Sequence, residues 1–286
     1  MKLSIVICNY NTRDDLARCL ESVEATKGDL TLEVIVVDNA SRDGSAEMVR
    51  RDFPNVALVA SSSNLWFNGG NNAGLRRARG EYIFILNPDT VLLPGTLHTL
   101  VNYLDAHADV GMVTCRMVFP DGAVQRNGSR FPSYSYLLLA HTFLGVLLPH
   151  RRSAAQREMW YAGWDRDSTR DVEIAPGSAL MGRRELLARL GFFDESLKLF
   201  FSDDDLSQRV RAAGAAVRYV AEATLIHREH ASVDQVKRLS TRIYFDDMVI
   251  FTRKYHGSFR AALLWLLLLP TRALMAMRAS WRASDR

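Results

Sequence analysis

The chain has 286 residues, of which 48% are hydrophobic and 24% charged. This length suits one large α/β domain or two modest ones, and the composition is that of a soluble globular protein without low-complexity tracts or repeats. The net charge of +4 is uneven, because residues 228–286 hold 11 Lys and Arg against 5 Asp and Glu, a balance of +6 that leaves −2 for residues 1–227. A basic tail on a near-neutral body points to an anionic surface, either membrane or nucleic acid.

Cysteine usage and apolar runs bear on the location of the protein in the cell. Cys8, Cys19 and Cys115 lie far apart without metal-ligand spacing, so we expect buried free thiols in a reducing compartment. The first residues enter an apolar strand pattern, with no signal peptide. The longest apolar run, residues 261–269, is too short to span a bilayer. We therefore expect a cytoplasmic protein, which a basic tail could attach to the inner face of the cell membrane.

The first 90 residues alternate between strand and helix patterns. Helices are expected after Thr12, after Ser41 or Asp43, and in a short basic stretch that ends at Arg79. Apolar runs of strand length, which have no helical spacing, occupy residues 3–8, 32–37, 56–60 and 81–86. The alternation predicts an α/β fold with a doubly wound, mostly parallel sheet flanked by helices.

The remainder of the chain is less regular. We expect a helical, mobile excursion over the site at 129–170, a turn at Gly177-Ser178-Ala179 and a helical, basic extension at 231–286. Further strands are expected at 110–114, 117–124, 172–175 and 216–220. Further helices are expected after Pro94 and at 185–190, 203–213, 233–255 and 259–283.

A polar turn, Asn87-Pro88-Asp89, follows the apolar run at 81–86. Proline cannot donate to a sheet ladder and favours extended geometry in the residue before it, so the strand is expected to end here. Asp89 then lies past the carboxyl edge of a central strand, where ligands bind in open α/β sheets. A carboxylate on a stiff turn suits a hard divalent cation that carries phosphates. The alternative is an ordinary turn, because Asn, Pro and Asp all favour turns.

Two earlier strands also end in polar residues. Asn9 and Tyr10 follow the first strand, and Asp38 follows the second. Because parallel strands end at one edge of the sheet, these side chains are expected near Asp89. An aromatic ring there can stack on a base, and a carboxylate can accept hydrogen bonds from base or ribose groups. The alternative for each is a helix-capping loop.

A segment at 64–74 contains three Gly and four Asn. Glycine permits close backbone approach, and a following helix would offer free N–H groups to phosphate. Asn64, Gly70 and Asn71 are therefore candidates for contacts with the phosphate groups of a ligand. The alternative is an ordinary loop, because a Gly-rich loop is a weak signal.

Three adjacent acids, Asp203, Asp204 and Asp205, follow two aromatic residues. Asp205 is explained as the N-cap of the next helix, but Asp203 and Asp204 cannot both cap it. An acid at a helix N-terminus with like-charged neighbours can accept a proton near neutral pH. The alternative is a solvated acidic face. His227 follows a strand and a short connection; imidazole is a common metal ligand, although a lone His is usually structural.

These residues together identify a resemblance. The chain resembles the family 2 inverting glycosyltransferases, which have a GT-A fold, and is most similar to their rhamnosyltransferase-like branch. The resemblance covers residues 3 to about 232, and its motifs are specific mainly through their order and spacing. The matching stretches are residues 6–11, 36–45, 64–74, 86–90, 177–179, 191–195 and 200–206, together with His227.

The resemblance implies roles for these residues. Its donor-side set, which would bind a nucleoside diphosphate-sugar within about residues 1–115, comprises Asn9, Tyr10, Asp38, Asn64, Gly70, Asn71 and Asn87. Asp89 and His227 would hold Mg²⁺ or Mn²⁺, and Asp203 would be the general base. Gly177, Ser178 and Asp204 would lie on the acceptor side, within about residues 116–230. Residues 1–230 would then be the glycosyltransferase domain.

Three residues depart from the family pattern. Asn87 replaces the first Asp of Asp-x-Asp, as is common in the rhamnosyltransferase-like branch, and gives the cation less charge. Ser202 replaces a frequent Glu, which weakens the choice of Asp203 over Asp204, although the spacing to Asp205 favours Asp203. Trp66 replaces a frequent glycine, and the sequence offers no explanation.

The implied function is inverting transfer of a sugar, with rhamnose as the candidate, to a glycan or lipid-linked acceptor in cell-surface polysaccharide synthesis. The alternatives are a catalytically weak nucleotide-sugar-binding protein and a nucleotidyltransferase, for which the sequence lacks a basic phosphate loop. The apolar tail, with Trp265 and Trp281, suits an anionic membrane surface, or else packing on the body or on another subunit. It does not suit nucleic acid, because its aromatic residues are not arrayed for stacking.

Overall fold

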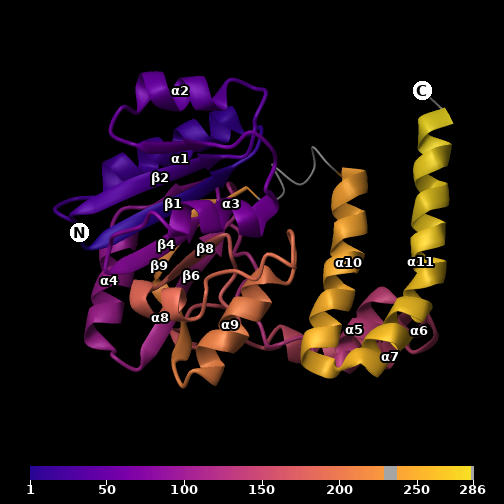
Figure 1. The fold of residues 1–286 in the computed structure, drawn as a ribbon. Helices are drawn as coiled ribbons and strands as arrows, with labels where there is room; N and C mark the ends of the chain where they lie inside the picture. Colours follow the sequence, from indigo (N-terminus) through magenta and orange to yellow (C-terminus); the bar gives the residue numbers. More distant parts are fainter. Residues whose placement is uncertain (229–236, 285–286) are drawn as a thin grey trace.

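A computed structural model describes residues 1–228 and 237–284, and the side chains of residues 1–228 and 239–275. Its centre is a mixed sheet with the strand order β3-β2-β1-β4-β8-β6-β9-β5, with β7 paired to β9 (Figure 1). The strands are β1 (Leu3–Asn9), β2 (Leu32–Asp38), β3 (Ala57–Ala60), β4 (Tyr82–Leu86), β5 (Thr90–Leu92), β6 (Val110–Val118), β7 (Arg170–Asp171), β8 (Ala179–Arg183) and β9 (Ala216–His227). The helices are α1 (Arg13–Thr26), α2 (Ser45–Asp52), α3 (Trp66–Leu75), α4 (Thr96–Ala106), α5 (Tyr134–His141), α6 (Leu144–Leu147), α7 (Pro149–Met159), α8 (Arg184–Arg189), α9 (Ser202–Ala212), α10 (Lys237–His256) and α11 (Ser258–Ser284).

The first four strands form the predicted parallel half of the sheet. β1 pairs in parallel with both β2 and β4, and β2 pairs in parallel with β3. Successive residues of β1 enter different cores, because Ile5 and Ile7 pack on one face of the sheet and Val6 on the other. A strand covered on both faces needs apolar residues at every position, which explains the unbroken apolar runs.

The second half of the sheet differs from the prediction. β8, which the sequence did not indicate, lies at the centre of the sheet and runs antiparallel to both β4 and β6. One continuous strand, β6, replaces the two expected at 110–114 and 117–124. β9 continues past the predicted end at 220, with a shift in its register to β6, and reaches His227. The sheet is therefore mixed: the pairs among β1 to β4 and the pair β6–β9 are parallel, and the pairs that involve β5, β7 and β8 are antiparallel.

Most of the Gly- and Asn-rich segment at 64–74, where a loop was expected, belongs to helix α3. The basic stretch up to Arg79, where a helix was expected, follows α3 as a turn and irregular structure. Glycine lets this helix lie close to the sheet: a Cβ at Gly70 would come within 2.4 Å of the Cys8 sulfur, and one at Gly74 within 2.5 Å of Val6. The glycines are thus explained by helix–strand packing.

The predicted helix caps are only partly correct. Thr12 precedes α1, but its hydroxyl donates to Asn9 Oδ1 (2.7 Å) and makes no cap bond. Asp43 lies close to the start of α2, where its carboxylate accepts from the Ser45 backbone N–H (3.0 Å). The three cysteines are free, as expected, and burial raises the pKa of each thiol to about 12.

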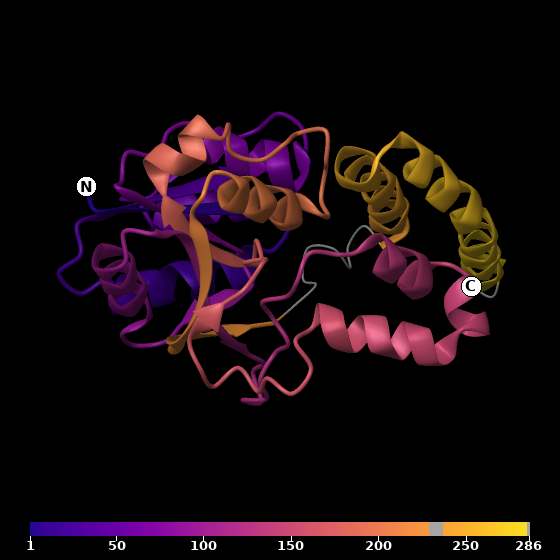
Figure 2. The ribbon, with the colours of Figure 1, turned by 90° about the horizontal axis from the view of Figure 1, so that it is seen from below.

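Five helices, α5, α6, α7, α10 and α11, form a helical lobe beside the sheet, at the right of both Figure 1 and Figure 2. The excursion at 129–170 is thus helical, and its predicted mobility stays a prediction. The buried core of the lobe combines side chains of α5, α10 and α11 with two from the segment that leads into α9, Leu197 and Phe201. The other members are Leu137, Phe245, Met248, Phe251, Leu264 and Leu268. The predicted domain boundary at 230 and the predicted helix start at 233 lie outside the described residues, as does the side chain of Trp281.

The apolar run at 261–269 belongs to a longer apolar helix. Residues Ser258–Met275 of α11 are long and apolar enough to cross a membrane by length and composition alone, with a mean hydropathy of 1.3, and 17% of this segment is buried. The apolar segment is therefore twice as long as the unbroken apolar run at 261–269, from which we expected a helix too short to span a bilayer.

Candidate functional site

A cavity of about 480 Å³ opens at the carboxyl ends of β1, β2 and β4. Its walls come from the strand ends, the start of α3, helix α5 with the segments on either side of α5–α7, the start of α9, and α10. The predicted site residues that line it are Tyr10, Asn64, Asn87, Asp89, Gly177, Ser178, Asp203, Asp204 and His227. The predicted residues that do not line it are Asn9, Asp38, Gly70 and Asn71.

Asn9 and Asp38 are buried side by side behind the cavity wall. Asn9 Nδ2 donates to Asp38 Oδ1 (3.1 Å), and the Ser41 backbone N–H donates to Asp38 Oδ2 (3.0 Å). Their neighbours Tyr10 and Asn39 line the cavity instead. The Asp38 carboxylate therefore holds the ends of β1 and β2 together, and these ends carry Tyr10 and Asn39 into the cavity wall.

The start of α3 contributes Asn64 and Trp66 to the cavity. Trp66 has φ of +61°, a left-handed conformation that glycine adopts without strain and that other residues rarely adopt. The Asn39 side chain donates to the Trp66 carbonyl oxygen (2.9 Å) and fixes this turn. Asn71 donates within its own helix, to the Phe67 carbonyl oxygen (2.9 Å).

Asp89 and His227 face each other across the cavity edge. β5 pairs with β9 so that Thr90 lies opposite His227, which is the last residue of β9 and does not follow a connection as expected. Asp89 Oδ1 and His227 Nε2 are 3.4 Å apart, and both side chains are buried. The sheet register therefore brings together two residues that are 138 positions apart in the chain.

Gln125, which the sequence did not indicate, orients this histidine. Its amide nitrogen donates to the His227 carbonyl oxygen, and its amide oxygen accepts from His227 Nδ1 (3.0 Å). Since an amide oxygen only accepts, Nδ1 carries a proton, and Nε2 of a neutral ring presents a lone pair toward Asp89. A lone pair and a carboxylate oxygen repel each other unless a cation lies between them or the ring is protonated. The pair therefore fits a divalent cation.

Asp203 and Asp204 occupy the first turn of α9. The Gly177 backbone N–H donates to Asp203 Oδ2 (3.0 Å), and the two carboxyl groups share a hydrogen bond. Burial raises the pKa of Asp203, although hydrogen bonds from Gly177 and Asp204 oppose the rise. Burial and the charge of Asp203 together raise the pKa of Asp204 well above its usual range. Asp204 is thus the member that keeps a proton, and Asp203 is the member that can accept one.

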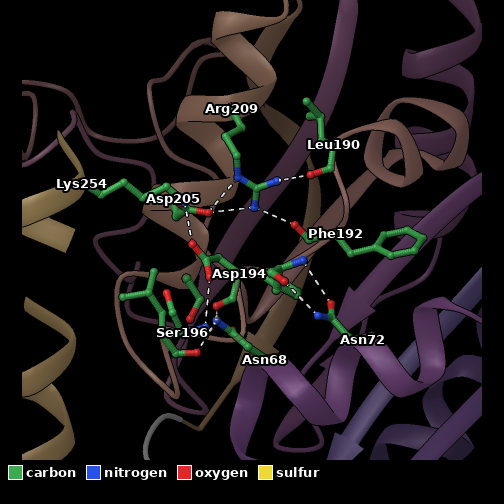
Figure 3. A network of polar contacts seen from close by, with 12 residues as sticks. Asn68, Asn72, Leu190, Phe192, Asp194, Ser196, Asp205, Arg209 and Lys254 are labelled. Carbon is green, nitrogen blue, oxygen red and sulfur yellow. Dashed lines mark hydrogen bonds and ion pairs between the residues drawn. The ribbon is translucent and has the colours of Figure 1, made fainter. Parts of the chain in front are cut away.

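Asp205 is not the N-cap that the sequence predicted. It is fully buried and accepts from Arg209 Nε (2.8 Å), Lys254 Nζ (2.6 Å) and the Tyr255 hydroxyl (2.6 Å). Figure 3 shows Asp205 between Arg209 of the same helix and Lys254 of α10. This arrangement anchors the helix that carries the two cavity acids to the helical lobe.

The segment before α9 is held from both sides. On one side, Asn68 of α3 donates to the carbonyl oxygens of Asp194 and Leu197 (both 2.8 Å), and Asn72 donates to that of Phe193 (Figure 3). On the other, buried Asp247 of α10 accepts from the backbone N–H groups of residues 198–200 at 2.9–3.1 Å. The start of α9 is therefore fixed between α3 and α10.

Hydrogen bonds connect the strand-end side of the cavity with the acids at the start of α9. The Asn87 backbone N–H donates to the Ser178 carbonyl oxygen (2.9 Å), and the backbone N–H of the neighbouring Gly177 donates to Asp203. The strand ends, the Asp89–His227 pair and the acids thus follow one another along one cavity. Such an arrangement can hold a phosphorylated ligand next to a proton acceptor.

The sequence matches a known family model. The model described as "Glycosyl transferase family 2" matches residues 4–191. The N-acetylglucosaminyl-diphospho-decaprenol L-rhamnosyltransferase of Mycobacterium tuberculosis is 27% identical over 302 residues, which cover 99% of this chain and 95% of that protein. The O-antigen biosynthesis protein RfbC of Myxococcus xanthus is 29% identical over 81% of this chain, which spans only 18% of RfbC.

Solved structures of similar fold are also glycosyltransferases by name. A mannosyltransferase from Pyrobaculum calidifontis, in complex with GDP-Man and Mn²⁺, gives a TM-score of 0.57 at 20% identity and covers 98% of this chain and 80% of its own. GalNAc-T7 with UDP, GalNAc and Mn²⁺ gives a TM-score of 0.59 at 14% identity, covering 79% of this chain and 44% of its own. At these identities the likeness concerns the fold.

Proposed function

Because the chain belongs to glycosyl transferase family 2 and has the GT-A fold of its structural neighbours, we propose that it is a rhamnosyltransferase that acts on a lipid-linked acceptor. It is a glycosyltransferase of cell-surface glycan synthesis, similar over nearly its whole length to a mycobacterial L-rhamnosyltransferase. The proposed donor is a nucleoside diphosphate-rhamnose, and the proposed acceptor is an N-acetylglucosaminyl diphospho-lipid. Both proposals rest on the near-complete coverage of that relative.

The observation that carries the proposal is the Asp89–His227 pair at the edge of the cavity that also holds Asp203. Asp89, His227 and the amide oxygen of Asn87 would hold Mg²⁺ or Mn²⁺ together with diphosphate oxygens, since the described residues contain no group of three or more His, Cys, Asp or Glu that would suffice alone. A bound cation neutralises negative charge on the leaving diphosphate. Mn²⁺ in two structural neighbours supports this assignment.

Asp203 is proposed as the general base of a single displacement. The acceptor hydroxyl oxygen forms its bond to the anomeric carbon while the bond from that carbon to the diphosphate oxygen breaks on the opposite face. The hydroxyl proton passes to the Asp203 carboxylate. The Gly177 N–H and protonated Asp204 orient that carboxylate through their hydrogen bonds.

A thermal-shift panel of nucleotide-sugars, each with and without Mn²⁺, tests the proposed donor. We expect a nucleoside diphosphate-rhamnose to raise the melting temperature more than the matching nucleoside diphosphate-glucose, and only when Mn²⁺ is present. Asp89→Ala should remove the part of the shift that depends on Mn²⁺. Equal shifts in melting temperature with and without Mn²⁺ would reject the proposed cation site. If no nucleoside diphosphate-rhamnose shifts the melting temperature, rhamnose is rejected as the transferred sugar.

We also propose that the helical lobe docks on an anionic lipid surface, which would bring the site to a lipid-linked acceptor. Two segments of the lobe expose apolar side chains, and exposed basic residues Arg151, Arg152 and Arg260 lie on or next to them. The exposed apolar side chains are Phe143, Val146, Leu147 and Leu148 around α6, and Phe259, Leu263, Trp265, Leu266, Leu269, Leu274 and Met275 on α11. Exposed apolar residues interspersed with Arg suit peripheral binding.

A further inference from the structure

One end of the cavity is lined by aromatic residues that none of the steps above uses. This aromatic wall consists of Tyr136 and His141 from α5, Trp160 after α7, Phe200 before α9, and Tyr244 from α10. All five side chains are only partly buried, whereas their neighbours in the lobe core are buried. The wall therefore presents ring surface to the cavity.

The rings fix one another in place. Tyr244 lies edge-on to Phe200, with ring centroids 4.9 Å apart, and edge-on to His141 at 5.4 Å. The Tyr244 hydroxyl is 3.3 Å from His141 Nε2, and Tyr136 is perpendicular to His141 at 6.0 Å. Edge-to-face contacts of this kind hold aromatic side chains in defined orientations. The wall is thus organised before any ligand enters.

The aromatic wall adjoins the acid pair, because Phe200 precedes Asp203 by three residues, packs against Tyr244 and lines the same cavity. Burial raises the pKa of the Tyr136 and Tyr244 hydroxyls, so both stay protonated and can donate hydrogen bonds. In the other direction, contacts lead from Asp203 through Gly177 and Ser178 to Asn87. Asp203 thus lies between the Asp89–His227 pair and the wall. A displacement with inversion needs its nucleophile on the side of the anomeric carbon away from the diphosphate, which is the side of the wall.

We propose that the aromatic wall is the binding subsite for the sugar ring of the acceptor. The C–H groups of a sugar ring carry partial positive charge and pack on the negative faces of aromatic rings, while the Tyr136 and Tyr244 hydroxyls can hydrogen-bond to sugar hydroxyls. The wall itself lacks Lys and Arg, so it suits an uncharged ring better than a phosphate. This assignment rests on the proposed function, because it takes the reaction to be glycosyl transfer.

The test replaces single rings and measures the two substrates separately. Tyr136→Leu and Tyr244→Leu should each raise the KM for an N-acetylglucosaminyl diphospho-lipid of short chain by about three- to tenfold, the range expected for loss of an aromatic contact. The donor KM should not change. Tyr244→Phe, which keeps the ring, should stay within about twofold of the wild type if ring stacking dominates.

Tyr134→Leu is the matched control. Tyr134 lies on the same helix but packs near His256 and outside the cavity, so its replacement should leave both KM values unchanged. Calorimetric binding of the acceptor probe gives a readout that needs no turnover. If the wild-type protein binds the acceptor probe but transfers no sugar to it, the proposed function is rejected while the proposed subsite is not. Folded Leu variants with unchanged acceptor affinity, or with equal losses for donor and acceptor, would overturn the subsite.

Discussion

Asp203 and Asp204 are adjacent, chemically identical side chains with different proton affinities. Burial raises the pKa of both, but the charge of Asp203 raises that of Asp204 further, and the hydrogen bond between them stabilises an ionised Asp203. A base must be unprotonated to act, so activity should be full above the pKa of Asp203 and fall as pH drops through it. Because that pKa is raised, the acidic limb of kcat/KM should lie above the ordinary range for Asp.

A pH–rate profile of kcat/KM checks this expectation, with donor stability measured at each pH. Asp14→Asn, at an exposed position on α1, is a control that should leave the profile unchanged. An acidic limb at or below the usual Asp value would contradict the raised pKa.

Gln125 is predicted to set the metal affinity through His227. Gln125→Leu removes the hydrogen bond to the His227 ring and the one to its backbone carbonyl oxygen. Mn²⁺ affinity should therefore fall by about 10- to 100-fold, as is typical for the loss of a residue that orients a metal ligand. Titration of Mn²⁺ in the presence of the donor measures this. Gln156→Leu makes the same change outside the cavity and should have no effect. Equal affinities in the two variants would show that Gln125 does not support a metal ligand.

The sequence indicated those cavity residues whose positions follow from local patterns, such as the end of a strand or the start of a helix. Asp89 and Asp203 line the cavity, as their positions at a strand end and a helix start led us to expect. His227 also lines it, although it ends β9 and does not follow a connection as expected. Gln125 had no such pattern, because its position next to His227 depends on the pairing of remote segments. The sequence also could not show that Asp38 faces Asn9 and Ser41 inside the wall.

At the scale of elements, α10 fixes the segment that leads into the acids. Asp247→Asn leaves one acceptor oxygen for the three backbone N–H groups of residues 198–200 and turns a donor toward them. We expect a loss of about 1–3 kcal/mol in the free energy of unfolding. Urea unfolding measures this loss, and kcat should fall because Asp203 follows this segment directly.

Asp246→Asn is the matched control, since Asp246 is the preceding residue and forms half-exposed ion pairs with Arg242 and Arg272. Its replacement should cost no more than about 1 kcal/mol. If the two variants are equally stable, Asp247 does not anchor the segment.

Two elements that were not predicted from the sequence, β8 and α3, are stabilised mainly by tertiary packing. β8 is a short strand directly followed by α8, so it offers too few residues for a periodic signal. α3 contains three Gly and three Asn, residues with weak helix propensity, and is stabilised by its contacts. Asn68 and Asn72 bind the 193–197 segment, and Gly70 and Gly74 admit the neighbouring strands.

At the scale of the whole molecule, the helical lobe joins a mid-chain insertion to the C-terminal helices. The sequence predicted helices in both places but gave no sign that they share a core. Truncation after Ser258 would remove Leu264 and Leu268 from that core, so surface substitutions are the better test of membrane binding. Phe259→Ser with Leu266→Ser changes two exposed side chains and leaves the core intact.

This double variant should bind less to vesicles that contain anionic lipid, while wild-type binding should weaken with added salt. Co-sedimentation measures both effects, with neutral vesicles as the control. Size-exclusion chromatography of the same variants examines self-association. If the wild type does not bind anionic vesicles, or if the substitutions only change the oligomeric state, the exposed face does not dock on lipid.

The division of roles between the two acids can be measured directly. Turnover and donor affinity should be compared in Asp203→Asn and Asp204→Asn, with donor binding followed by calorimetry in the presence of Mn²⁺. Asp203→Asn should lose about 10²- to 10⁴-fold in kcat while binding the nucleotide-sugar normally, because only the proton acceptor is lost. Asp204→Asn still donates a hydrogen bond to Asp203 and should lose much less. Near-normal turnover in Asp203→Asn, with a large loss in Asp204→Asn, would contradict the assignment of Asp203 as the base.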